Sequence, residues 1–433
     1  MGTAALIVVA NMIGSGIFTT SGFVARDVGS PGWLMGLWLA GGLIALAGAL
    51  SYAELGAAFP QAGGEYVYLR EAYGPFVAYL TGWTSLAVGF SGAIAAATLA
   101  FAGYLHSYFP AMDRAGSADK VVALAALWSL TAIHVRGLGP GGVVQRLLTG
   151  GTMLAIAALV CAAFTLGHGS ASNFNSSAPA HGSVAVSLIF ILYAYSGWNA
   201  AAYLAGEIRN PRREIPTALV AGTALVTLLY LAMNAMYLYA LPIPAMSGVL
   251  TIAEKASVAL FGPFAAHLVA AMLALALLGS VNAMVLAGPR VYFAMARDGL
   301  LPRALGVVDL SRGTPARAVL LQSGWASVLI VFFGAFERLV VYTGFAITVF
   351  TAMAVAALIV LRVRRPGAPR PFTVPGYPWT PAAYVIVSIW IVAVTMLTRP
   401  TETVLGALTV VAGVPFYFCA RRRNRRMAIH SSN

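Results

Sequence analysis

The chain has 433 residues, of which 60% are hydrophobic and only 9% are charged, and its formal net charge is +13. Soluble globular proteins carry about a quarter charged residues, so this chain has too few charges to cover a surface exposed to water. The composition therefore excludes a soluble protein and indicates a polytopic membrane protein. Because cationic membrane proteins usually concentrate their basic residues in one set of loops, the net charge does not indicate nucleic-acid binding.

Apolar runs long enough to cross about 30 Å of hydrocarbon, bounded by Pro, Gly and charged residues, predict an all-α protein of about twelve transmembrane helices. The predicted spans are 2–25, 33–58, 76–106, 120–137, 147–168, 183–206, 217–240, 263–296, 316–333, 337–361, 378–397 and 402–420. A short external helix is expected within 247–261. The first span has no basic flank and no small-residue cleavage site before the next segment, so we interpret it as retained rather than as a signal peptide. A native tail before Met1 is left open.

The distribution of Lys and Arg predicts the orientation. With a cytoplasmic N-terminus, 20 of the 26 Lys and Arg residues fall in cytoplasmic connections and 6 fall outside. By the positive-inside rule, both termini are expected in the cytoplasm, with the chain in the cell (inner or plasma) membrane as a multi-pass protein. Residues 421–433 form a basic tail, for which a stop-transfer flank is favoured over a lipid-headgroup anchor.

The motifs of several other function classes are missing from the sequence. It contains no GxxxxGK[ST] phosphate loop, which excludes an ATP-driven pump built on this chain alone. Nucleophile-elbow and HExxH patterns are absent, and the histidines show no metal-ligand spacing. Cys161 and Cys419 lie in apolar runs and are interpreted as small hydrophobic residues. We therefore expect neither an enzyme nor a firm metal site or cofactor.

Two spans are interrupted by small and polar residues. The first carries Gly14-Ser15-Gly16, and the sixth carries the stretch YAYSGWN at 193–199. The two interruptions correspond if spans 1–5 (1–168) and spans 6–10 (183–361) form two inverted repeats, with spans 11–12 (378–420) outside them. A single interruption of this kind more often serves close helix packing, but two at matching positions favour a binding site.

An unwound turn at membrane depth exposes backbone groups that suit a zwitterion. The N–H groups from Ser15 to Ile17, at the positive end of a half-helix, would bind a carboxylate. Carbonyl groups near Ile13, Tyr193 and Ser196 would accept hydrogen bonds from an ammonium group. Such backbone is tolerated in a membrane where it lines a cavity.

Longer stretches around these residues resemble the amino acid–polyamine–organocation superfamily, particularly its L-type amino acid transporter branch. The similar stretches are IGSGIF (13–18), FPQAGGEYVYLREAYGPFVAYLTGW (59–83), AYSGWNAAAYLAGEIRNPRREIPTAL (194–219) and LGSVNAMVLAGPRVYFAMARDGLLP (278–302). The resemblance implies a five-plus-five inverted-repeat (LeuT-like) fold with helices 1 and 6 broken, two additional C-terminal helices, and transport by alternating access.

The resemblance also implies roles for individual residues. It places the substrate between the two breaks, with Tyr193 as an aromatic gate; the implied substrate-binding residues are Ile13, Gly14, Ser15, Gly16, Ile17, Tyr193, Ser196, Gly197 and Asn199. Asn199 stands where arginine–agmatine exchangers of the superfamily have Glu. Because no Asp or Glu falls at the predicted midplane of a span, neutral substrates are expected rather than cationic ones.

The fifth span departs from the L-type pattern, which usually has Lys where this chain has Thr152. The hydroxyl of Thr152, together with Ser280 and Asn282, could instead contribute to a site for a coupling ion, Na⁺ or H⁺. The alternative is that Thr152 only packs and bonds to its own helix.

The leading hypothesis is a secondary transporter of neutral L-amino acids. The alternatives are a cationic amino acid or amine transporter, a Na⁺-coupled symporter and, more distantly, a channel or a non-transporting sensor. Eukaryotic L-type transporters join a heavy chain through a Cys in the loop after the third span. Here the corresponding loop, 106–120, has no Cys, so a disulfide-linked partner is not expected. The substrate, exchange or symport, and the oligomeric state are left open.

Overall fold

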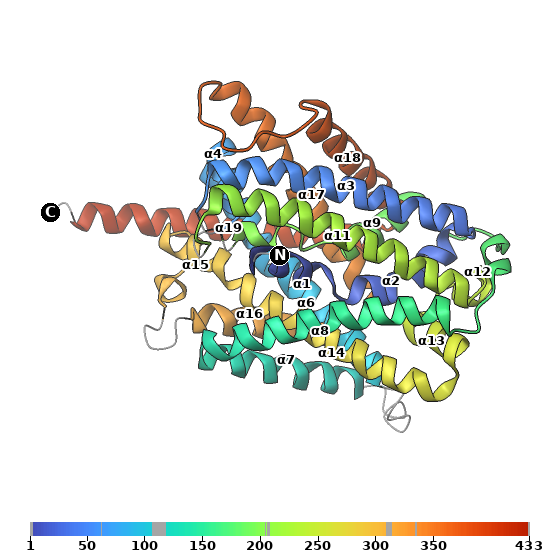
Figure 1. Ribbon diagram of the computed structural model, residues 1–433. Helices are drawn as coiled ribbons and strands as arrows, with labels where there is room; N and C mark the ends of the chain where they lie inside the picture. Colours follow the sequence, from blue (N-terminus) through green and yellow to red (C-terminus); the bar gives the residue numbers. More distant parts are fainter. Residues whose placement is uncertain are drawn as a thin grey trace.

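The computed structural model describes residues 3–61, 63–105, 118–203, 205, 208–308, 314–333 and 336–431. The described residues form a bundle of helices whose long members run roughly along one direction (Figure 1). Within them, ten helical segments are long and apolar enough to cross a membrane, and two shorter apolar helices cover Thr149–Thr165 and Val184–Tyr195. The all-helical membrane architecture predicted from composition is thereby confirmed.

The helices follow one another along the chain without intervening sheet in the described ranges. Their bounds are α1 Thr3–Met12, α2 Ser15–Val28, α3 Pro31–Ala58, α4 Glu65–Tyr73, α5 Pro75–Thr84, α6 Phe90–Leu105, α7 Ala118–Arg136, α8 Leu138–Thr165, α9 Val184–Tyr195, α10 Ala200–Tyr203, α11 Pro211–Ala240, α12 Ile243–Met246, α13 Ile252–Phe261, α14 Pro263–Ala287, α15 Pro289–Arg297, α16 Ala316–Phe333, α17 Phe336–Arg364, α18 Trp379–Thr398 and α19 Pro400–Ser431. A π-helical turn, Ser85–Gly89, joins α5 to α6.

Every predicted span overlaps a helix, but the last helix is longer than expected. The last span does not stop at 420, because α19 continues as one helix to Ser431. The short helix expected within 247–261 corresponds to α13, which follows a turn, and α12 lies just before that turn. Arginine and alanine have high helix propensity, which explains why the basic stretch prolongs the helix.

Prolines define where several helices begin. Pro occupies the first turn of α3, α5, α11, α14 and α15, where its missing N–H has no intrahelical partner to lose. Gly74 and Gly262 precede two of these prolines with positive φ angles of 90° and 81°. These residues turn the chain sharply between consecutive helices.

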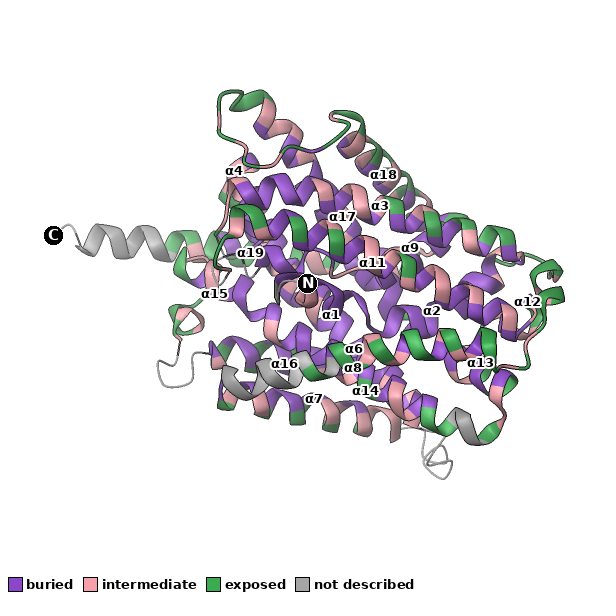
Figure 2. Ribbon diagram, viewed as in Figure 1, coloured by how far each residue is buried: buried purple, intermediate pink, exposed green. Residues whose placement is uncertain are grey.

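The most buried span is the first. In its most apolar stretch 89% of the residues are buried, against 28% for α7, 28% for α18 and 22% for α19. Figure 2 shows α1 and α2 in the centre of the bundle and the exposed residues on the peripheral helices. The interrupted helix therefore lies where side chains and backbone from many elements can meet.

Candidate functional site

The first span is broken at its centre, as the glycines predicted. Helix α1 ends at Met12 and α2 begins at Ser15, and Gly14 between them is extended, with φ −137° and ψ −156°. No side chain caps the N-terminus of α2. The first N–H groups of a helix have no intrahelical acceptor, so the start of α2 presents donors and a positive dipole end inside the protein.

The second break lies against the first. Helix α9 ends at Tyr195, and a tight turn leads to α10 at Ala200. Within this turn Gly197 has φ +96°, a backbone conformation that L-residues with a Cβ rarely adopt. A Cβ at Gly197 would also lie 2.6 Å from the carbonyl oxygen of Asn11. Glycine is therefore required here both by conformation and by the close approach of α1.

Tyrosines from neighbouring helices hold the broken ends in place. The hydroxyl of Tyr230 in α11 lies within hydrogen-bond distance of the carbonyls of Met12 and Ala194, so it spans the ends of α1 and α9. About two turns further along α11, the Tyr237 hydroxyl donates to the carbonyl of Ile17 at 3.2 Å. Sequence reasoning missed this role, although the seven-residue spacing places both tyrosines on one face of α11.

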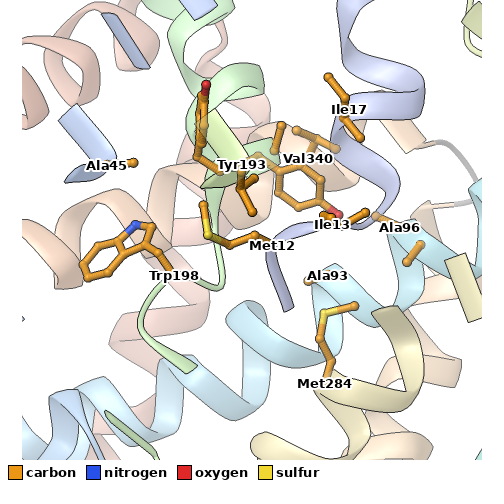
Figure 3. Close-up of a cluster of buried hydrophobic side chains, with 14 of the residues drawn as sticks. Met12, Ile13, Ile17, Ala45, Ala93, Ala96, Tyr193, Trp198, Met284 and Val340 are labelled. Carbon is orange, nitrogen blue, oxygen red and sulfur yellow. The ribbon is translucent and has the colours of Figure 1, made fainter. Parts of the chain in front are cut away.

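Tyr193 connects the two breaks directly. Its hydroxyl lies 3.2 Å from the hydroxyl of Ser15, and its ring packs edge-on against Phe336 with 6.2 Å between centroids. Figure 3 shows the ring beside Ile13, at the break of the first span. The carbonyl of Tyr193 accepts hydrogen bonds from both the N–H and the hydroxyl of Ser196, at 3.0 and 2.6 Å. In this conformation that carbonyl is therefore already occupied.

A cavity of about 100 Å³ lies beside the second break. A single water needs roughly 10–15 Å³ by the same kind of measure, so the cavity has room for a small ligand. Four of the sequence-predicted residues line it: Tyr193, Ser196, Gly197 and Asn199. The predicted residues of the first break, 13–17, are not among the lining residues, and Tyr193 lies between them and the cavity. Figure 3 shows Tyr193, Trp198, Ala93 and Met284, which contribute to the lining.

Close packing accounts for part of the small-residue pattern. A Cβ at Gly16 would lie 2.2 Å from the Cα of Ala194 in α9, and one at Gly14 would lie 2.5 Å from the hydroxyl of Ser280 in α14. The packing interpretation and the binding-site interpretation of these glycines are thus compatible, because the same close approach brings the two breaks together.

Glu65 is the site residue that the sequence reasoning missed. It stands at the start of α4, only 8% exposed, and it lines the cavity although it belongs to no span. The side-chain amide of Asn199 donates to its carboxyl at 2.6 Å. The expectation of neutral substrates considered only Asp and Glu at the midplane of a span, whereas Glu65 reaches the cavity from outside the spans, because the connection after α3 folds back into the bundle. The stretch GGEY at 63–66 was the available signal.

The three residues predicted for a coupling ion do not converge on one point. Thr152 and Ile13 line a separate small cavity of about 10 Å³ together with Thr149, while Ser280 lies against Gly14. The side-chain oxygen of Asn282 lies 2.8 Å from the Nε2 of His134 in α7. Thr152 thus lies behind the first break as expected, whereas Asn282 is engaged elsewhere.

Ion pairs bridge different helices at both ends of the bundle. At the end that carries α4, Arg362 of α17 binds Glu54 of α3 through two nitrogens, one at 2.8 Å, and the backbone N–H of Val374 donates to the same carboxylate. At the end that carries α12, Glu337 of α17 accepts from Arg26 and from Arg399, at 3.2 and 2.8 Å. Glu207, the acidic residue at the end of the sixth predicted span, lies outside the described residues.

Metal and disulfide chemistry find no support in the part of the chain that the structure describes. No cluster of three or more His, Cys, Asp or Glu side chains there could hold a metal ion. Cys161 and Cys419 are both free and exposed on the outer faces of α8 and α19. The loop predicted to lack a heavy-chain cysteine lies mostly outside the described residues.

A helical membrane bundle with two broken central helices around a small cavity defines a membrane transporter for a small solute. The chain belongs to the amino acid permease family, whose model matches residues 1–418. The family and its relatives are transporters rather than enzymes, so the resemblance to the superfamily and the prediction of amino acid transport are confirmed.

Curated relatives match almost the whole chain. The mouse (Mus musculus) b(0,+)-type amino acid transporter 1 is 32% identical over 423 residues, which cover 95% of this chain and 85% of the relative. The serine/threonine exchanger SteT of Bacillus subtilis (strain 168) is 31% identical over 434 residues, covering 97% and 96%. The human (Homo sapiens) cystine/glutamate transporter is 29% identical over 418 residues, covering 95% and 83%.

Proposed function

We propose that this transporter exchanges neutral L-amino acids across the membrane by alternating access. The substrate carboxylate binds the N–H groups at the start of α2, its ammonium group binds carbonyls at the two breaks, and its side chain extends into the cavity. The observation that carries the proposal is the uncapped N-terminus of α2 at the centre of the protein, where Ser15 contacts the hydroxyl of Tyr193, a residue that also lines the cavity.

The lining of the cavity supports the neutral class of substrate. Its described residues are mainly apolar and hydroxyl-bearing, and they include no Lys or Arg. An anionic side chain would therefore be buried without a counter-ion, which is costly. Glu65 is compatible with a neutral side chain when its carboxyl is protonated. The relative named as a serine/threonine exchanger is consistent with this class.

The architecture proposed for transport by alternating access is the five-plus-five inverted repeat. Spans 1–5 and 6–10 form the two repeats, and α18 and α19 lie outside them. Both termini are placed in the cytoplasm by the distribution of Arg and Lys. Tyr193 acts as the gate, since its ring and hydroxyl cover the start of α2. The ion pairs of Glu54 and Glu337 fasten opposite ends, so alternating access breaks them in turn.

Uptake into proteoliposomes tests this function. The purified full-length protein is reconstituted with and without internal unlabelled amino acids, and a panel of radiolabelled neutral, cationic and anionic amino acids is offered outside. We expect saturable uptake of neutral amino acids that internal neutral amino acids accelerate. Uptake of no amino acid under either condition would refute the proposal.

A Na⁺-coupled symporter is the second candidate, favoured by the cavity between Ile13 and Thr152. Its volume of about 10 Å³ matches one water or ion, and Thr149 and Thr152 line it; oxygen ligands suit hard cations. Replacement of Na⁺ by choline separates the two candidates. A symporter loses accumulation in choline and weakens in Thr152→Val, whereas an exchanger without Na⁺ is unaffected by either change.

A further inference from the structure

Glu65 is brought into the cavity by an unusual backbone path. The two preceding residues, Gly63 and Gly64, have φ angles of +121° and +52°, which glycine adopts without steric cost. A Cβ at Gly64 would lie 2.6 Å from the ring of Tyr203 in α10. The pair of glycines therefore lets the chain pass Tyr203 and insert the first residue of α4 into the bundle.

Among the described residues, no positively charged side chain pairs with the carboxyl of Glu65. Its carboxyl accepts a hydrogen bond from the amide of Asn199, which also donates to the hydroxyl of Tyr203 at 3.0 Å. Among the described residues, the titratable groups that face it from the surrounding elements are phenols: Tyr52 of α3, Tyr68 of α4, Tyr203 of α10 and Tyr384 of α18. The arginine of its own helix, Arg70, is paired with Asp298 at 2.6 Å.

Glu54 is a second buried carboxylate in this protein, and its partners differ from those of Glu65. Glu54 is 3% exposed, and it is bound by Arg362, Arg370 and a backbone N–H. Glu65 is almost as buried and has no described cationic partner. Because a buried carboxylate without a counter-ion is disfavoured, we expect Glu65 to carry a proton or to face a positive charge held in the cavity.

A hydroxyl without a hydrogen-bond partner in the same cavity supports the presence of a polar ligand. The hydroxyl of Thr84 is buried, lines the cavity and has no hydrogen-bond partner among the described residues. Buried polar groups nearly always have a partner. A polar ligand is therefore expected in this cavity.

We propose that Glu65 binds the positively charged amine of a substrate side chain, in competition with a proton, and so sets the selectivity between neutral and cationic amino acids. This inference rests on the proposed exchange of amino acids through the cavity. With the carboxyl protonated the site accepts neutral side chains; with the carboxyl ionised it also accepts an amine.

The pH dependence follows from burial. Burial raises the pKa of the Glu65 carboxyl above its usual value, and hydrogen bonds from its neighbours oppose that shift. Only the ionised form attracts an amine, so the affinity for a cationic substrate rises as the pH rises towards this raised pKa. Well below the pKa, that affinity falls about tenfold for each unit of pH.

Competition against exchange of a neutral amino acid tests the assignment. Proteoliposomes containing the full-length protein take up radiolabelled L-serine, or another neutral amino acid that the panel identifies, between pH 5 and 8.5. L-Lysine is the cationic competitor, and norleucine, which has the same carbon chain without the amine, is the neutral control. We expect L-lysine to inhibit at least tenfold more strongly at the high end of this range, with norleucine inhibition unchanged.

Two variants assign the effect to Glu65. In Glu65→Gln, L-lysine inhibition should be weak and independent of pH, while norleucine inhibition is kept. Glu65→Asp should retain the pH dependence with weaker L-lysine binding. Inhibition by L-lysine that is independent of pH in the wild-type protein overturns the assignment without any variant, as does equal inhibition of wild type and Glu65→Gln. If the wild-type protein exchanges no amino acid at all, the proposed function itself fails.

Discussion

Replacing Gly16 by alanine tests whether α2 and α9 must touch for the transporter to bind its substrate. A Cβ at Gly16 would lie 2.2 Å from the Cα and 2.4 Å from the Cβ of Ala194, whereas ordinary van der Waals contact begins at 3.4 Å. These atoms are the backbone and the one-carbon side chain of Ala194, so no flexible side chain can move aside. The two helices must therefore separate by about 1 Å at this point.

The magnitude of the effect follows from the cost of overpacking. Inserting a methyl group into a closely packed interior costs about 1–3 kcal/mol. Since about 1.4 kcal/mol corresponds to a factor of ten in affinity, strain borne by the substrate-bound state lowers the affinity roughly 5- to 150-fold. The separation also stretches the contact between Ser15 and Tyr193, which now measures 3.2 Å.

Thermal unfolding in detergent and substrate binding measure these two consequences. The control is Gly36→Ala in α3, where a Cβ meets nothing within 4 Å; removing a helical glycine there should leave binding unchanged and not reduce stability. Gly16→Ala should lower the unfolding temperature by a few degrees and weaken binding. Wild-type stability and affinity in Gly16→Ala would refute the close contact on which the site is built.

Substitutions at three further positions probe the gate, the ion pairs and the cavity. Tyr193→Phe keeps the ring but loses the hydroxyl contact with α2, so we expect exchange to persist with less than about a tenfold change in affinity, whereas Tyr193→Ala should lose saturable exchange; uptake assays compare the two. Glu54→Gln leaves Arg362 without its carboxylate, and the unfolding temperature should fall by an amount equivalent to about 1–3 kcal/mol. Asn199→Glu sets a second carboxyl beside Glu65, so the pair should share a proton; thermal unfolding should show lower stability at pH 8 than at pH 5, and no such difference would contradict the 2.6 Å contact.

Elements with a strong local signal were predictable from the sequence. Apolar length alone placed every span on a helix, because a bilayer requires about twenty apolar residues and internally satisfied backbone groups. Glycine and serine at 14–16 and 196–197 located both breaks, since glycine has a low helix propensity and serine competes for backbone hydrogen bonds. The family resemblance then connected the breaks with amino acid transport, which the relatives confirm.

The tertiary structure alone decided which groups meet in the centre. No local pattern shows that Tyr230 spans the ends of α1 and α9, or that Tyr193 contacts the start of α2 and also lines the cavity. Asn282 appeared equivalent to Ser280 in sequence, but they face different neighbours because they lie on different sides of α14.

Glu65 is the clearest example of a residue whose place in the cavity only the tertiary structure decides. Hydropathy assigns it to a polar connection outside the spans, and on that basis its charge would lie in water. The φ angles of Gly63 and Gly64 instead direct it inwards, beside Asn199. Composition and periodicity thus determine which segments enter the membrane, whereas the chemistry of the cavity depends on where a connection folds back, which is a long-range property of the packed chain.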